Sequence, residues 1–200
     1  MNFWYHINKR ILPQLVWRKP PTHKSVYLTF DDGPHPQITP WVMNQLDKYG
    51  AKGTFFVVGD NAERYPELIE EITERGHSIG NHTQHHVKGW GMTDAAYIEE
   101  IKLCDKRIPE NRLFRPPFGR INIKSIKQLA DYEIIMWDVL SRDYLKRLDT
   151  HAAQRRIRNR TVDGSIAVFH DSEKAEKNLK MLLPNYLSFL NEQGYKMEKL

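Results

Sequence analysis

The sequence contains one cysteine, Cys104, among its 200 residues. An internal disulfide therefore cannot form, which excludes the small secreted proteins that are built on a disulfide framework. Apolar residues at helical spacing between Tyr97 and Cys104 predict a helix with the thiol on its buried face. A thiol in that position is an inert packing group.

Long hydrophobic runs are also missing. No stretch approaches the ~18 apolar residues that a transmembrane helix requires. Lys9, Arg10 and Pro13 interrupt the only hydrophobic stretch near the N-terminus, so the sequence lacks the layout of a secretory signal peptide. From these features the expected location is cytoplasmic or peripheral to a membrane.

The N-terminal segment, residues 1–24, is expected to pack on the main domain or to flank it. Its apolar residues fall roughly at helical spacing: Phe3, Trp4, Ile7, Ile11, Leu15, Val16 and Trp17. Closure of one end of the domain is the ordinary interpretation. The alternative is a membrane-surface anchor, in which basic residues meet anionic lipid head groups, namely Lys9, Arg10, Arg18 and Lys19.

Composition and charge point to one globular domain. The chain is 40% hydrophobic and 28% charged, which is close to the average of folded soluble domains. Its net charge is +5 and its pI is about 9.2. The basic residues are spread along the chain except at residues 155–160, where a helix with a solvated face is expected. Nucleic acid is therefore not an expected partner, whereas the charge permits an acidic glycan or another anionic surface.

After Pro20-Pro21, short apolar runs alternate with helical patterns. The predicted strands are residues 26–30, 53–58, 78–80, 113–114, 134–137, 166–169 and 195–197. The predicted helices run from Thr39 to about Gly50, over 66–75, from Thr93 or Asp94 onward, and over 123–131, 150–160 and 175–192. Such alternation implies an α/β fold with about seven parallel strands joined by right-handed crossovers. Both a barrel and an open sheet fit the pattern.

Six of these strands are followed by polar or ionisable residues: Asp31-Asp32, Gly59-Asp60, Asn81-His82, Arg115, Asp138 and His170-Asp171. In barrels and open α/β sheets alike, the carboxyl ends of parallel strands meet at one edge, where active sites are assembled. We therefore expect the chemistry of this chain at that edge.

Two of these strand ends carry metal-ligand residues. Asp31 and Asp32 cannot point the same way on an extended strand, so one could face a metal while the other faces a water or substrate. His82 and His86 are four residues apart, which on a helical turn places two imidazoles on one face. His85 is an alternative second ligand. Two histidines and one carboxylate suit Zn²⁺, Co²⁺, Ni²⁺ or Mn²⁺ and leave coordination positions open, as in a catalytic site.

Two further residues are weaker candidates on their own. Arg115 precedes two prolines that fix the backbone, an arrangement that suits a guanidinium held as the partner of a carboxylate. A surface-loop arginine is the alternative. His170 ends an apolar strand, where a histidine is ordinarily a packed core residue. Beside a metal site it becomes a candidate general acid.

Together these motifs resemble the polysaccharide deacetylases, carbohydrate esterase family 4, which include chitin and peptidoglycan N-deacetylases. Thr29-Phe30-Asp31-Asp32-Gly33-Pro34 and His82-Thr83-Gln84-His85-His86 carry the resemblance, and the match runs from about Ser25 to the C-terminus. The resemblance implies a deformed (β/α) barrel and a metal-dependent hydrolase that removes acetyl groups from N-acetylated, or also O-acetylated, sugars. Zinc is the metal that we expect first.

The same resemblance implies roles for individual residues. Asp32, His82 and His86 would bind the metal, Asp31 would be the general base, Arg115 would orient Asp31, and His170 would be the general acid. The family commonly has Asp-Ser-x-Asp-Trp as its fourth motif, where this chain has Leu140-Ser141-Arg142-Asp143-Tyr144. Leu140 therefore appears in place of the carboxylate that tunes the acid histidine, a role that Asp138 or Asp143 could take over.

The expected partner is an N-acetylated glycan or oligosaccharide. Four aromatic residues near strand ends are candidates for stacking on sugar rings: Trp90, Phe118, Trp137 and Tyr144. Two other functions compete with deacetylation. One is a catalytically silent carbohydrate-binding protein, for which Leu140 is the argument. The other is a metal-dependent amidohydrolase that acts on a small cyclic amide, because barrels host several chemistries.

Overall fold

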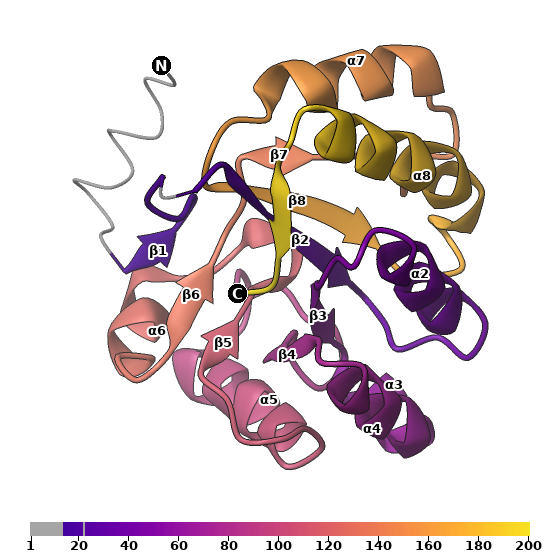
Figure 1. Ribbon diagram of the computed structural model, residues 1–200. Helices are drawn as coiled ribbons and strands as arrows, with labels where there is room; N and C mark the ends of the chain where they lie inside the picture. Colours follow the sequence, from indigo (N-terminus) through magenta and orange to yellow (C-terminus); the bar gives the residue numbers. More distant parts are fainter. Residues whose placement is uncertain (1–13, 22) are drawn as a thin grey trace.

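The fold is a strongly curved parallel sheet surrounded by helices (Figure 1). The computed structural model describes residues 14–21 and 23–200. Over these residues the strand order is β1-β6-β5-β4-β3-β2-β8-β7, with β9 also paired to β2, and every ladder is parallel. The strands are β1 (Leu15–Val16), β2 (Ser25–Asp31), β3 (Thr54–Val57), β4 (Ser78–Asn81), β5 (Leu113–Phe114), β6 (Glu133–Ile135), β7 (Val139–Leu140), β8 (Ser165–His170) and β9 (Lys196–Glu198).

The sheet is the deformed (β/α) barrel that the resemblance implied. β2 lies between β3 and β8, and its residues Val26, Leu28 and Phe30 are fully buried in the main core. Burial on both faces explains the near-continuous apolar runs of the central strands. All seven predicted strands are present. β1 and β7 are additional, and at two residues each they are too short to leave a periodic signal in the sequence.

Helices occupy the outside of the sheet (Figure 1). They are α2 (Ile38–Asp47), α3 (Gly59–Arg64), α4 (Pro66–Glu74), α5 (Asp94–Asp105), α6 (Ile123–Gln128), α7 (Thr150–Arg160) and α8 (Glu176–Glu192), with a single 3-10 turn, η1 (Pro117–Gly119). The predicted helices are all found, and α3 was missed. Thr93 caps α5 by accepting from Ala96 N–H. Thr39, the predicted first residue of this helix, lies inside α2, and its hydroxyl donates a hydrogen bond to Asp171.

The described end of the N-terminal segment belongs to the sheet. Leu15 and Val16 form β1 beside β6 rather than the last turn of a helix, so the helical expectation is wrong for these residues. Arg18 then pairs with the carboxylate of Asp138 at 2.7 Å. Residues 1–13, which carry most of the predicted helix and membrane anchor, lie outside the described residues. Within the described part of the chain, no helix is long and apolar enough to cross a bilayer.

Cys104 behaves as its sequence context predicts. Its side chain is fully buried in the main core, and burial raises the pKa of its thiol to about 12. A thiol with that pKa is protonated at neutral pH and is a poor nucleophile.

Candidate active site

A cavity of about 760 Å³ opens at the carboxyl edge of the sheet. Its floor is made by residues that end β2, β4 and β8, in agreement with the expectation from the strand ends. The lining residues are Asp31, Asp32, Val58, Asn61, His82, His86, Phe118, Arg120, Trp137, Leu140, Tyr144, Val168, His170, Ser172, Glu173 and Lys174. Five of the six sequence-predicted site residues are among them, and the sixth, Arg115, donates a hydrogen bond to Asp31.

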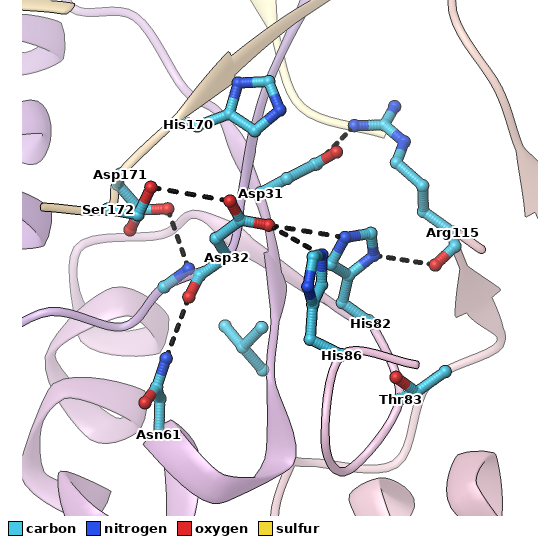
Figure 2. Close-up of polar contacts among 12 residues, drawn as sticks. Asp31, Asp32, Asn61, His82, Thr83, His86, Arg115, His170, Asp171 and Ser172 are labelled. Carbon is cyan, nitrogen blue, oxygen red and sulfur yellow. Dashed lines mark hydrogen bonds and ion pairs between the residues drawn. The ribbon is translucent and has the colours of Figure 1, made fainter. Parts of the chain in front are cut away.

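Asp32, His82 and His86 form a cluster that could hold a metal ion. One ligand atom from each lies within 4.8 Å of the other two. Nε2 of His86 is 3.1 Å and Nε2 of His82 is 3.7 Å from Oδ1 of Asp32, and Figure 2 shows both rings pointing at that carboxylate. One carboxylate and two imidazoles form a donor set suited to Zn²⁺ and its neighbours, with coordination positions left for other ligands.

The electrostatics of this cluster favour the protonation states that a metal requires. Burial lowers the pKa of His82 to about 4, so its imidazole is neutral at pH 7. Nδ1 of His82 lies 2.7 Å from the carbonyl oxygen of Arg115, which as an acceptor fixes the proton on Nδ1 and leaves Nε2 free as a ligand. The neighbouring histidines outweigh the desolvation of Asp32 and hold the pKa of its carboxyl below its usual range.

The histidine loop is not the helical turn that the spacing suggested. Residues 82–86 are irregular, and Thr83 and His86 have positive φ angles of 65° and 53°. Hydrogen bonds from α3 hold the loop instead, because the N–H groups of Gly59 and Asp60 donate to the carbonyls of Thr83 and Gln84. Non-glycine residues in left-handed conformations are uncommon and concentrate at functional sites.

His85, the alternative ligand, points away from the cluster. Its Nδ1 lies 2.9 Å from Oε1 of Glu100 on α5, and its side chain is half exposed. That hydrogen bond raises the pKa of His85. The geometry therefore brings His86, and not His85, into contact with Asp32.

Asp31 faces away from the histidines and toward Arg115. Nη1 of Arg115 donates to Oδ1 of Asp31 at 2.7 Å, and both side chains are buried. The guanidinium also donates to Thr29 Oγ1 and to two carbonyls at the end of β6, and it stacks 4.1 Å from the ring of Phe56. Its alternative assignment as a surface-loop residue is therefore wrong. Asp32 turns the other way because it leaves the strand with a φ of 78°.

His170 is paired with a buried carboxylate. Its Nδ1 lies 2.7 Å from Oδ1 of Asp143, and its backbone N–H donates to the other carboxylate oxygen. Burial alone would lower the pKa of His170, but Asp143 outweighs it and the pKa is raised to about 9. The loss of a carboxylate at Leu140 therefore does not leave His170 without a partner. Asp138, the other candidate, is paired with Arg18 instead.

Three of the four aromatic candidates line the cavity. Phe118 is 61% exposed, has a φ of 60°, and places its ring 4.8 Å from that of His86. Tyr144 lies edge-on to His170 at 5.0 Å. Trp137 also lines the cavity. Trp90 does not, although it is 54% exposed and lies beneath Arg120.

Two residues that hold the chain around Asp32 and Gly33 were not predicted to do so from the sequence. Asp171 is fully buried and accepts hydrogen bonds from Thr39 Oγ1 and from the N–H of Gly33. Asn61 donates to the carbonyl of Asp32 at 2.9 Å (Figure 2). The only feature of the sequence that pointed to Asp171 was its position directly after His170. Asn61 belongs to α3, a helix that the sequence did not reveal.

Comparisons with known proteins identify the family of this chain. The family model described as polysaccharide deacetylase matches residues 18–137. The chain is 32% identical over 191 residues to a peptidoglycan-N-acetylglucosamine deacetylase of Bacillus cereus, covering 91% of this chain and 89% of that protein. It is 30% identical over 198 residues to the peptidoglycan-N-acetylglucosamine deacetylase PgdA of Listeria monocytogenes, covering 94% of this chain but only 41% of that longer protein.

Solved structures show the same fold. The crystal structure of the peptidoglycan N-acetylglucosamine deacetylase Bc1960, bound to 4-naphthalen-1-yl-N-oxidanyl-benzamide, superposes with a TM-score of 0.82 and 25% identity. The superposition covers 92% of this chain and 89% of that one. With more than half of the chain matched by the family model and a relative above 30% identity over nearly its full length, the chain belongs to the polysaccharide deacetylase family.

Proposed function

We propose that this chain is a metal-dependent N-deacetylase that hydrolyses the acetamide of an N-acetylated glycan. The observation that carries the proposal is that two groups with different fixed partners line the same cavity as Asp32. Asp31 is fixed by Arg115, and His170 is fixed by Asp143. A base and an acid that flank a metal-ligand cluster are the components of amide hydrolysis.

The residues present fit a divalent metal. Asp32, His82 and His86 would hold it, since their ligand atoms converge and His82 is neutral with its Nε2 unprotonated. When bound, such an ion supplies Lewis acidity to the acetyl carbonyl and to a water molecule. Zinc is our first choice, because imidazole with carboxylate is a borderline donor set, and Co²⁺, Ni²⁺ or Mn²⁺ are alternatives.

Asp31 is assigned as the general base. Its carboxylate lines the cavity, and Arg115 holds one of its oxygens, which fixes the orientation of the other. Arg115 is itself immobilised by four hydrogen bonds and by the Phe56 ring. Asp31 therefore takes the proton of the attacking water without reorganisation of its surroundings.

His170 is assigned as the general acid. With a pKa raised to about 9, its imidazole is protonated at neutral pH. Nδ1 is engaged by Asp143, so the proton that is delivered to the departing amine comes from Nε2. Protonation of the leaving nitrogen is required because an amine anion is not expelled at neutral pH.

The oxyanion donor is assigned to the N–H of Phe118. The neighbouring residues of this turn are excluded as donors. Pro117 has no N–H, and the N–H groups of Gly119 and Arg120 already donate to the carbonyls of Pro116 and Pro117. One such donor contributes about 3 kcal/mol to transition-state stabilisation. The exposed ring of Phe118 and that of Tyr144 provide apolar faces on which a sugar can stack.

The test is deacetylation of N-acetylglucosamine oligomers, peptidoglycan fragments and acetylated xylan, followed by mass spectrometry with added Zn²⁺ or Co²⁺ and again after EDTA. We expect stepwise loss of acetyl groups that EDTA abolishes and added metal restores. A protein that binds metal and glycan but releases no acetate from any substrate would instead be the silent carbohydrate-binding protein. Turnover of small cyclic amides alone would favour the amidohydrolase.

A further inference from the structure

Two exposed cations, Arg120 and Lys174, line the active-site cavity in addition to the proposed catalytic groups. Arg120 follows η1, on the side of His86, and Lys174 follows β8, on the side of His170. Strands β4, β3 and β2 lie between β5 and β8 in the sheet order. The cations therefore approach the cavity from loops that belong to different halves of the sheet.

Each cation lies against an aromatic ring that restricts it. The guanidinium of Arg120 lies 5.2 Å from the ring centre of Trp90. Nζ of Lys174 lies 5.4 Å from the ring centre of Tyr144, which in turn contacts His170 at 5.0 Å. Cation–π contact at such distances is attractive and reduces the number of conformations that a long side chain samples. The ring of Tyr144 thus contacts both Lys174 and His170, the proposed general acid.

Neither cation has an acidic partner within the described residues. The ion pairs of the cavity are used by other groups: Asp31 is paired with Arg115, and His170 with Asp143. Asp32, the second acid of the lining, belongs to the proposed metal-ligand cluster, and Glu173, the third, forms no ion pair with its neighbour Lys174 among the described residues. Outside the proposed catalytic and metal-ligand groups, the cavity lining therefore presents two cations, Arg120 and Lys174, and one anion, Glu173. This excess of positive charge is one that an anionic ligand would neutralise.

We propose that Arg120 and Lys174 are specificity-determining residues that bind a carboxylate carried by the glycan near the acetamide. This inference rests on the proposed function and narrows it to acidic N-acetylated sugars, such as N-acetylmuramic acid, over neutral chitooligosaccharides. The planar guanidinium of Arg120 matches a carboxylate with two parallel hydrogen bonds, and Lys174 adds a point charge.

The test compares two forms of one oligomer of alternating N-acetylglucosamine and N-acetylmuramic acid. In one form the carboxylate is free, and in the other it is converted to the methyl amide, which removes the negative charge and leaves the rest of the oligomer unchanged. Kd for each form is measured by isothermal titration calorimetry with the metal removed, and kcat/KM for each is measured with Zn²⁺ present. The variants are Arg120→Gln, Lys174→Gln and the double variant. Lys177→Gln is the matched control, since Lys177 is an exposed cation of α8 outside the cavity lining.

We expect the unaltered chain to bind the free carboxylate form about tenfold more tightly than the amide, since each exposed ion pair contributes about a threefold factor. Each single variant lowers this ratio about threefold, the double variant brings it to about one, and Lys177→Gln leaves it unchanged. The preference appears in Kd and KM rather than in kcat, and it weakens as salt is added.

Equal affinity of the unaltered chain for both forms, or a preference that survives in the double variant, overturns the inference. Deacetylation without a carboxylate preference would leave the proposed function standing and remove these residues from specificity. A carboxylate preference that depends on both cations, without any deacetylation, would support the inference while the proposed function fails.

Discussion

Asp143 and His170 form a partly buried carboxylate–imidazole pair, with 2.7 Å between Oδ1 and Nδ1. β7 and β8 are adjacent parallel strands, so the loop after β7 reaches the end of β8. Asp143 is fully buried there and also accepts the backbone N–H of His170. The pair fixes both the orientation and the charge of the proposed acid.

Replacing Asp143 by Asn removes that charge. In the unaltered chain, the Asp143 carboxylate raises the pKa of His170 to about 9, while burial acts to lower it. Because a general acid works only when protonated, activity of the unaltered chain should persist up to about pH 9 and fall above it. In Asp143→Asn the falling limb of the kcat/KM profile should move to lower pH, and kcat/KM at pH 7 should fall about 100-fold.

The control for that variant is Asp138→Asn. Asp138 also lies beside β8, but it pairs with Arg18 and with Ser165. We expect Asp138→Asn to lower the free energy of unfolding without moving the alkaline limb of the kcat/KM profile. Equal pH profiles for Asp143→Asn and the unaltered chain would remove Asp143 from the role of tuning His170.

The three histidines of the loop allow the metal assignment to be tested directly. His82→Ala and His86→Ala each remove a proposed ligand and should weaken zinc binding by more than about 100-fold, because even residues behind the ligands alter affinity by 10–100-fold. His85→Ala removes the imidazole that contacts Glu100 and should change the affinity less than about threefold. Competition with a chromogenic chelator measures all three. A loss in His85→Ala equal to that in His86→Ala would contradict the assignment.

Asp31→Asn should separate proton transfer from metal binding. The amide keeps an oxygen for Arg115 but cannot accept a proton from water, so turnover should fall by about 10²- to 10⁴-fold. Zinc affinity should stay within about threefold, since Asp31 faces Arg115 and not the histidines. Turnover and chelator competition on the same preparation provide the check. Retained turnover would exclude Asp31 as the base.

The polar residues at the strand ends, more than the strands themselves, allowed the candidate site to be predicted. Parallel ladders place successive carboxyl ends at one edge, so Asp31, His82 and His170 could be grouped from their positions after apolar runs. The order of residues along the chain could not predict the loop conformations. His86 reaches Asp32 through two residues with positive φ, which no helical spacing describes.

The partners of the proposed catalytic groups were harder to foresee than the groups themselves. Asp143 follows a two-residue strand that has no periodic signal, so its approach to His170 depends on a β7–β8 pairing visible only in three dimensions. The burial of Arg115 likewise depends on contacts with β2 and β6, which are distant in the sequence.

Gly33 is required because Asp171 occupies the space where a side chain would be. A Cβ atom at residue 33 would lie 2.2 Å from Oδ2 and 2.6 Å from Cγ of Asp171. The carboxylate cannot withdraw without breaking its buried hydrogen bonds to Thr39 and to the N–H of Gly33 itself. We therefore expect Gly33→Ala to lower the free energy of unfolding by about 3 kcal/mol and to weaken zinc binding, because Asp32 is the adjoining residue.

Gly50→Ala is the control for this variant, measured by urea denaturation and chelator competition. Gly50 has a φ of +61°, but a Cβ atom there would have no atom outside the adjoining residues within 4 Å. Gly50→Ala should therefore lower the free energy of unfolding by about 1 kcal/mol and leave zinc binding unchanged. Asp171→Ala in the Gly33→Ala background removes the obstruction, and the double variant should cost less than the sum of the two single changes. Equal costs for Gly33→Ala and Gly50→Ala would show that Asp171 yields to the methyl group, and that it does not hold the Asp31-Asp32 turn in place.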